Sequence, residues 1–256
     1  SPRGMSSAAS DVYKRQLGYP ESYYTPPPEG LEEIQILRGA ASLQYGTQFG
    51  GLINFKIKEP KPEDKFELIT RNTAGSNNLF TNFTSLSSSN KKSSYYGYVN
   101  YKKGDGFRPN SEFESINTFQ NFNYNLNEKS KITGEITYME YLAHQAGGLS
   151  DFMFANDPFQ SNRERNWFEI KWFLYNLKYL LEISKDSSFS FSFFGLDAKR
   201  NSLGFRTNRV DQIDYGDERD LIKGNFKNFG FESRYLTNYS FFNRKTYLLL
   251  GVKYLS

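Results

Sequence analysis

The feature that most constrains the fold is a two-residue alternation of apolar and polar side chains, which recurs from residue 65 onward. In residues 120–126, Phe122, Tyr124 and Leu126 alternate with three asparagines. Side chains of a β-strand point alternately to the two faces of a sheet, so a period of two predicts strand rather than helix. The pattern predicts about nine strands, at residues 65–71, 79–86, 95–102, 120–126, 132–141, 167–183, 188–197, 229–236 and 246–255.

The connections between these segments alternate in length along the chain. Short polar turns are expected at residues 87–92, 127–131, 184–187 and 237–244, and longer loops at residues 103–115, 144–166 and 198–227. This alternation is typical of an up-and-down antiparallel meander with all its short turns at one end. A transmembrane β-barrel has short periplasmic turns and long extracellular loops, whereas a soluble sandwich or propeller has no reason to sort its loops in this way.

The chemistry of the two strand faces fits a wall between lipid and water. The 256 residues include 24 Phe and 19 Tyr, yet the mean hydropathy is −0.68. Residues 188–193 alternate serine with phenylalanine, so one face suits lipid and the other suits a wet lumen. We therefore expect the aromatic residues to line lipid-facing girdles rather than a soluble core. The alternation by itself also fits a soluble aromatic-rich β-protein, whose polar face would meet bulk water.

The residue types present give little support to catalysis. The chain has no cysteine and one histidine, which excludes disulfides, thiol nucleophiles, cysteine zinc sites and histidine metal clusters. Glu135 and Glu140 are five residues apart on one predicted strand and so point to opposite faces. We expect His144 to be an ordinary surface side chain and the acidic residues 211–220 to form a solvated loop. The sequence thus predicts no catalytic residues, no cofactor and no directly bound metal.

The charge balance gives no sign of a nucleic-acid partner. The formal net charge is +4, from 32 basic and 28 acidic residues spread along the chain. A nucleic-acid-binding domain instead gathers its basic residues into a patch or stripe.

Residues 1–16 differ from the rest of the chain. The stretch SPRGMSSAASDVYKRQ has no strand or helix period and lacks the apolar run of a secretory signal. It resembles translated cloning sequence, with a native disordered terminus as the alternative. We leave it out of the fold prediction.

A glycine-rich block precedes the predicted strands. Residues 34–58 read IQILRGAASLQYGTQFGGLINFKIK, which is two short β segments joined through glycine-containing turns. Glycines at such joints allow positive φ or a close approach of two backbones. The nucleotide-binding patterns GxGxxG and GxxxxGK[ST] are both absent, so a phosphate-binding loop is not expected.

This block resembles the end of the plug domain of TonB-dependent outer-membrane receptors. The matching residues are Arg38, Gly39, Ser42, Tyr45, Gly46, Gly50, Gly51, Ile53 and Asn54, whereas Gln35 and Ala40 depart from the common pattern. The resemblance implies an all-β fold, an antiparallel transmembrane barrel of about 22 strands that encloses a plug. It assigns residues 17–61 to the C-terminal part of the plug and residues 62–256 to the N-terminal part of the barrel. With about nine barrel strands present, we expect the chain to be a fragment.

The same resemblance implies a function and partners. Such receptors lie in the outer membrane of Gram-negative bacteria, in contact with lipid and lipopolysaccharide. They import a ferric chelate, in which iron is cargo and not a cofactor, when the TonB energy-coupling complex pulls on the plug. We expect TonB to act through a region outside this chain. Arg38 is expected to form an ion pair between plug and wall, with Glu135 or Glu182 as its partner.

A second resemblance, at residues 18–27 and 145–168, is to the ferric dicitrate branch of these receptors. Residues 146–149 and 157–163 match a loop block of that branch. The resemblance implies ferric citrate as cargo and predicts ligand contacts in one loop, at Arg163 first and then at Arg165, Gln160 and Asn162. Arginine's planar fork of donors suits the carboxylates of an anionic chelate.

Other interpretations stay open at this point. The next predicted loop adds Arg200, Arg206 and Arg209, but among several acidic residues. The alternative to ferric citrate as cargo is another siderophore, cobalamin or a glycan. A non-transporting barrel of the adhesin type is a further alternative, although it would not need the plug that residues 34–58 indicate.

Overall fold

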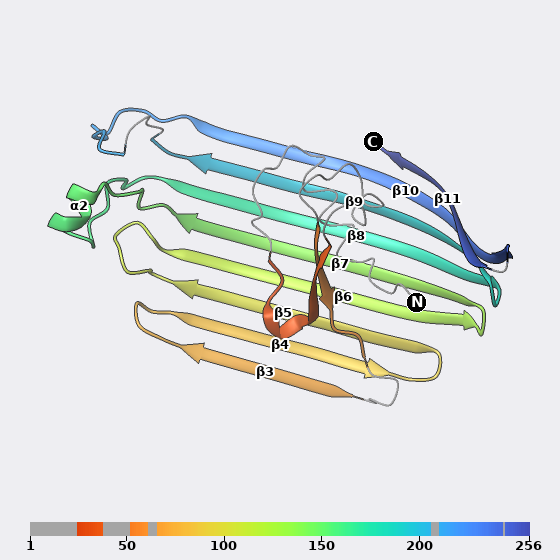
Figure 1. The fold of residues 1–256 in the computed structure, drawn as a ribbon. Helices are drawn as coiled ribbons and strands as arrows, with labels where there is room; N and C mark the ends of the chain where they lie inside the picture. The colour runs from red at the N-terminus through yellow and green to blue at the C-terminus, as the bar shows by residue number, and fades with distance from the viewer. Residues whose placement is uncertain (1–24, 38–51, 61–65, 206–209, 243) are drawn as a thin grey trace.

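The structure of the chain is a computed structural model that describes residues 25–37, 52–60, 66–205, 210–242 and 244–256 (Figure 1). Several predictions lie outside the described residues, namely those for residues 1–16 and for Arg38, Gly39, Ser42, Tyr45, Gly46, Gly50 and Gly51. No helix in the described part of the chain has the length and apolarity needed to cross a bilayer.

Within the described residues, nine strands form one antiparallel sheet in which every strand pairs with its neighbours in sequence. The predicted number of strands and their meander order are therefore confirmed. The strands are β3 (Glu67–Ala74), β4 (Phe80–Ser89), β5 (Ser93–Gly104), β6 (Phe113–Asn127), β7 (Ser130–His144), β8 (Trp167–Ser184), β9 (Ser187–Leu203), β10 (Leu221–Phe241) and β11 (Arg244–Leu255).

The connections are sorted by length, as the sequence predicts. The loops that follow β5, β7 and β9 lie at one end of the sheet, and the second of them carries the short helix α2 (Asp151–Asn156) (Figure 1). The tight turns that follow β4, β6, β8 and β10 lie at the opposite end. We call these the long-loop end and the short-turn end.

The prediction was wrong about the lengths of three connections, because β6, β9 and β10 extend into them. The predicted loops 103–115 and 198–227 shrink to residues 105–112 and 204–220, and β10 runs through most of the predicted turn 237–244 to end at Phe241. Lys199 still pairs with Asn225, and Arg200 with Gly224, in a continuous register. A strand that carries polar side chains on both faces loses its period of two in the sequence, while its backbone pairing continues.

Part of the predicted plug forms a separate two-stranded antiparallel sheet. A single 3-10 turn, η1 (Pro28–Gly30), leads into β1 (Leu31–Leu37), which pairs with β2 (Leu52–Ile57). Asn54, a residue of the plug pattern, is buried, and its Nδ2 donates to Oε1 of Gln35 across the pair at 2.8 Å. Lys56 of β2 donates a hydrogen bond to Glu32 of β1, and this bond raises the pKa of Lys56.

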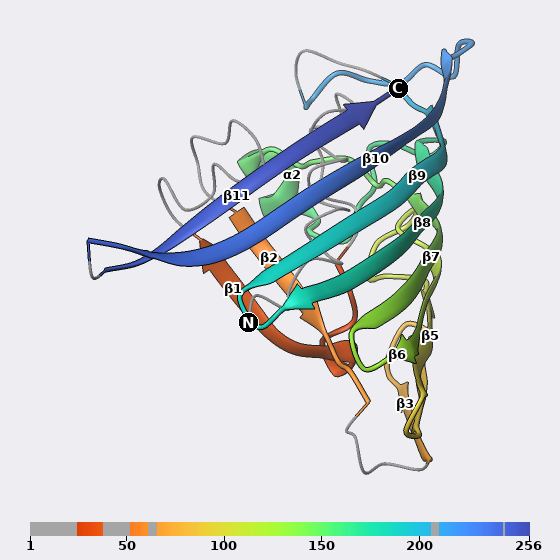
Figure 2. The same ribbon diagram turned by 90° about the vertical axis from the view of Figure 1, so that its right-hand side faces the viewer.

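One end of this small sheet, at Leu31 and Ile57, lies against the concave face of the large one (Figure 2). Further along it, Ile34, Ile36 and Ile53 are exposed. Leu31 and Ile57 pack on four aromatic side chains of the wall, and we call the group the apolar seam: Leu31, Ile57, Phe83, Tyr96, Tyr98 and Phe119. The Tyr98 ring is 1% exposed and stacks on Phe119 with centroids 5.8 Å apart. A Cβ at Gly30 would lie 3.0 Å from Cε1 of Tyr98, so the glycine permits the close approach of turn and wall.

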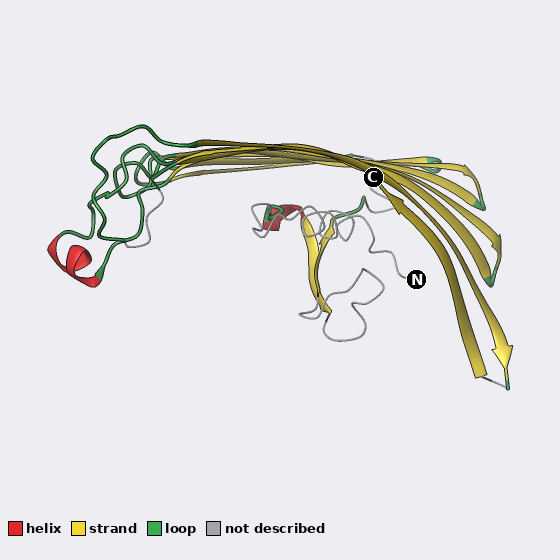
Figure 3. Cartoon of the chain, turned by 90° about the horizontal axis from the view of Figure 1, so that it is seen from above, coloured by secondary structure: helices red, strands yellow, loops and turns green. Residues whose placement is uncertain are grey.

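The seam identifies which side chains face the concave side throughout the sheet. Directly paired residues of neighbouring strands share a face, and one such row runs Tyr98, Phe119, Thr137, Leu174, Leu196. On β9, Phe194 and Leu196 are therefore concave and buried, whereas Phe193 is convex and 39% exposed. The convex side of the curved sheet, seen edge-on in Figure 3, therefore carries exposed apolar side chains, among them Val99, Phe191 and Phe193.

We expected the aromatic residues to lie mainly on the lipid-facing side. This was wrong, because aromatic side chains are also buried on the concave face. Besides the seam, a second buried apolar cluster occupies that face on β7 to β9: Met139, Phe168, Ile170, Trp172, Leu196 and Ala198. These positions have the same period of two as the convex ones, so the sequence pattern alone does not tell which apolar face meets lipid and which meets the interior.

Removing the central ring of the seam should destabilise the fold. Tyr98→Ala leaves a cavity between wall and plug, and we expect the free energy of unfolding to fall by about 3–5 kcal/mol. Tyr215→Ala is the matched control, because Tyr215 is 81% exposed in a loop. Thermal unfolding followed by circular dichroism measures both, and equal midpoints for the two variants would contradict a packed seam.

Candidate functional site

The candidate site is formed by three loops at the long-loop end: the first long loop (105–112), the second (145–166) and the third (204–220). The neck of the second loop is closed by a hydrogen bond of 2.9 Å from the N–H of Gln145 to the carbonyl of Asn166. Inside it, Ser150 caps α2 by accepting from the N–H of Met153. Gly147 adopts φ 79°, which glycine reaches without strain.

Arg163 joins the second loop to the third. Its side chain is buried, and its guanidinium donates to the carbonyls of Asn162, Gln212 and Val210, the last two at 3.1 and 3.4 Å. It also lies over the ring of Phe205, 5.0 Å from the centroid. Hydrogen bonds from a charged donor to carbonyls are stronger than neutral ones, so these contacts hold the two loops together firmly.

The other three predicted ligand residues also make loop contacts. Asn162 Nδ2 donates to the carbonyls of Gly148 and Val210 at 2.8 and 2.9 Å, and Gln160 Nε2 donates to the carbonyl of Met153 at 2.7 Å. The structure thus joins Asn162 and Arg163 through the carbonyl of Val210, whereas Gln160 contacts a different part of the second loop. Their contact with a cargo stays a prediction.

Arg165 has the most accessible of the predicted cationic groups. Its side chain is 41% exposed, and its Nη2 lies 3.1 Å from Oδ1 of Asp214 and 2.9 Å from the carbonyl of Asp217. The Asp214 side chain is only 12% exposed, so the pair is half-buried and the Arg165 guanidinium is its accessible partner.

The third loop contributes a cation that sequence reasoning did not single out. Arg219 pairs with Asp214, and its guanidinium lies 4.5 Å from the centroid of Phe205, the ring that Arg163 also contacts. Asp214 therefore binds both Arg165 and Arg219, so the acidic stretch is an ion-paired part of the loop rather than only a solvated one. Arginine's flat guanidinium suits both stacking and ion pairing.

Two of the remaining loop arginines are outside the described residues, and one was misplaced. Arg206 and Arg209 fall in the undescribed residues 206–209. Arg200 lies in strand β9 and not in a loop, with its guanidinium 5.1 Å from the centroid of Phe168. The cause is the extension of β9 described above.

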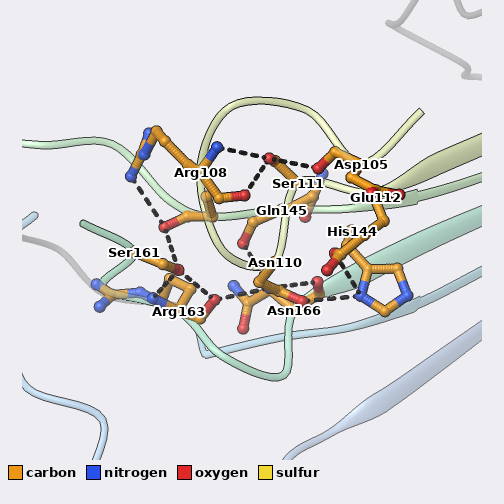
Figure 4. A network of polar contacts seen from close by, with 11 residues as sticks. Asp105, Arg108, Asn110, Ser111, Glu112, His144, Gln145, Ser161, Arg163 and Asn166 are labelled. Carbon is orange, nitrogen blue, oxygen red and sulfur yellow. Dashed lines mark hydrogen bonds and ion pairs between the residues drawn. The ribbon is translucent and has the colours of Figure 1, made fainter. Parts of the chain in front are cut away.

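The first long loop supplies contacts that the sequence prediction missed (Figure 4). Arg108 donates from Nε to the carbonyl of Gln160 at 2.8 Å and from Nη2 to the carbonyl of Ala146 at 3.3 Å. Asn110 contacts three further carbonyls of the second loop and the ring of His144. The only local signal is the Pro109-Asn110 pair, which is typical of a turn.

His144 is more than the plain surface side chain that was expected. Its Nδ1 lies 2.8 Å from Oδ1 of Asn110 and 3.6 Å from Oε2 of Glu112, so the first loop supplies both of its neighbours. In the described part of the chain, no group of three or more histidine, aspartate or glutamate side chains is placed to hold a metal ion.

Arg163→Lys should loosen the attachment of the third loop. A lysine ammonium cannot reproduce the fork that reaches Val210 and Gln212, nor the stacking on Phe205. We expect limited proteolysis within residues 210–220 to become about tenfold faster, since hydrogen bonds to charged groups contribute about 1.5–3 kcal/mol. Arg165→Lys is the control and should change cleavage little, because its ion pair is half exposed. Equal acceleration in both variants would show that Arg163 does not hold the loop.

Comparison with known proteins bears on the fold. No protein-family model and no curated protein sequence matches the chain. Among solved structures, the unliganded ferric citrate transporter FecA superposes with a TM-score of 0.74 at 21% identity, over 90% of this chain and 35% of FecA.

Two further structures show the same similarity. The ferripyoverdine receptor of the outer membrane of Pseudomonas aeruginosa has a TM-score of 0.70 at 12% identity, over 88% of this chain and 32% of the receptor. The copper transporter OprC has a TM-score of 0.67 at 14% identity, over 94% and 35%. The chain thus spans about a third of the length of each structure. The described residues form a nine-stranded antiparallel sheet and a separate two-stranded sheet, and they share the all-β fold of a plugged β-barrel.

Proposed function

We propose that this chain is part of an outer-membrane receptor that imports a ferric chelate with energy supplied through TonB. The observation that supports the proposal is the apolar seam, because there the two-stranded sheet β1–β2 packs on the concave side of a wall whose convex face is apolar, as a plug would. A channel that only admits small solutes has no need of a plug. Uptake of a large, scarce solute requires a wide lumen that is normally closed and opens for transport.

Transport then depends on contacts that hold the plug and can still rearrange. The concave wall offers polar partners beside the seam: Glu135 accepts from Nδ2 of Asn121 and of Asn176, both at 2.9 Å. Glu135 is buried and lies in the same cross-strand row as the seam residue Tyr96, through Asn121, whereas Glu182 lies beside the short turn after β8. Of the two candidates for an ion pair with Arg38, we favour Glu135 for this reason.

Ferric citrate is the cargo that we propose. The complex is anionic and exposes carboxylates, which arginine binds through paired hydrogen bonds. Arg165 is the loop cation best placed to meet it, because its side chain is partly exposed and its present partner is a carboxylate. Arg163, Gln160 and Asn162 would support the site from the same loop. The similarity to FecA, with 21% identity, agrees with this choice of cargo.

Binding of ferric citrate by the complete receptor tests the cargo. We expect saturable binding of radioactive ferric citrate to the purified protein, and Arg165→Ala should raise the Kd about tenfold, the size of one charged hydrogen bond. Arg244→Ala is the matched control, since Arg244 is exposed at the start of β11, beside a short turn at the other end of the sheet. It should leave the Kd unchanged.

Each part of the proposal can fail separately. Absence of saturable ferric citrate binding, with binding of another chelate retained, would exclude citrate and keep the receptor. An equal effect of Arg165→Ala and Arg244→Ala would exclude the loop site. Uptake of iron by cells that lack TonB would contradict the transport mechanism itself.

A further inference from the structure

We propose that Asn110 is a positioning residue, which sets the affinity for the cargo by holding the second long loop in its binding conformation without touching the cargo. The inference rests on the proposed function and adds a residue from a different loop. Asn110 lies in the first long loop and is 9% exposed, so it is not placed to meet a ligand directly.

The side-chain amide of Asn110 fastens the neck of the second loop. Its Nδ2 lies 3.1 Å from the carbonyl of Gln145 and 3.1 Å from that of Asn166, the first and last residues of the loop. It also lies 2.7 Å from the carbonyl of Arg163. The Asn110 amide group therefore contacts the first and last residues of the second loop and also the backbone of the segment that carries Arg163 and Arg165.

The other side of the amide is fixed as well. A carboxamide oxygen can only accept, so the contact of 2.8 Å with Nδ1 of His144 requires the ring to donate from that nitrogen. His144 in turn lies 3.6 Å from Glu112. Both ends of the amide are therefore engaged, and its orientation relative to the carbonyls is determined (Figure 4).

The backbone restricts which residue can occupy this position. Asn110 has φ 57°, in the left-handed region that asparagine, aspartate and glycine tolerate better than other residues. Two substitutions are therefore compatible with the backbone at this position. Asn110→Asp keeps the shape and the backbone but replaces the donor by an oxygen that faces three carbonyl oxygens, and Asn110→Gly keeps the backbone and removes the amide.

Asn77→Asp is a matched control. Asn77 has φ 55° in the turn between β3 and β4, at the same end of the sheet as the long loops. The substitution introduces the same charge in the same backbone conformation, without the contacts to the second loop.

We expect both Asn110 variants to weaken ferric citrate binding about tenfold at pH 7.5, the loss that corresponds to one buried donor, and to speed proteolysis within the second loop. Asn77→Asp should change neither by more than about twofold. Retained β-sheet circular dichroism shows that the variants fold. Lowering the pH should restore binding to Asn110→Asp and not to Asn110→Gly, because a protonated carboxyl can donate to a carbonyl again.

Two other ionisable side chains, His144 and Glu112, lie near position 110. The affinity of each variant at each pH is therefore divided by the affinity of the unsubstituted receptor at that pH. Faster proteolysis with unchanged affinity would overturn the inference and leave the receptor proposal intact. Weaker binding with no change in proteolysis would also overturn it, because Asn110 would then act by contact. Failure of the unsubstituted receptor to bind any ferric chelate would instead overturn the proposed function.

Discussion

Backbone pairing within the nine-stranded sheet is the constraint on which the rest of the structure depends. Inside a bilayer no water is available to unpaired backbone groups, so a wall made of strands must satisfy them through its neighbours. In the described sheet, register shifts occur between Asn125 and Asn127 and between Glu182 and Ser184, both beside short turns. A register shift of one residue elsewhere would move every side chain of that strand to the opposite face of the sheet. The register therefore fixes which side chains are exposed on the convex face and which lie on the concave face with the seam.

The two attachments to this wall use different chemistry. The plug segment is held by the apolar seam, where Tyr98 and Phe119 stack out of contact with water. The long loops are held by guanidinium and amide donors on backbone carbonyls, mainly from Arg163 and Asn110. Loops without regular structure leave many carbonyls unpaired, and long polar side chains can satisfy them. Under the proposed function, the loops form the docking surface and the seam fixes one side of the plug below it.

Much of the fold could be predicted from the sequence, since a period of two and sorted connection lengths follow directly from strand geometry. The ends of β9 and β10 could not, because strands that pass into water carry polar residues on both faces. The seam was also missed: alternation shows that Tyr98 and Val99 point to opposite faces, but not what covers either. For the site, the sequence placed four candidate residues in one loop. It could not show that the buried Arg163 donates to the carbonyls of Val210 and Gln212. Nor could it show that Asn110 donates to the carbonyl of Arg163, 53 positions away.

Accessibility along β9 tests whether the convex face meets lipid while the concave face is covered. The chain has no cysteine, so single cysteines at positions 191, 193, 194 and 196 can each carry a spin label in the complete receptor in lipid bilayers. We predict strong relaxation by oxygen, which dissolves in lipid, at positions 191 and 193. Positions 194 and 196 should be shielded from oxygen and from a water-soluble nickel chelate. Equal accessibility at all four positions, or access of the nickel chelate to positions 191 and 193, would contradict the account.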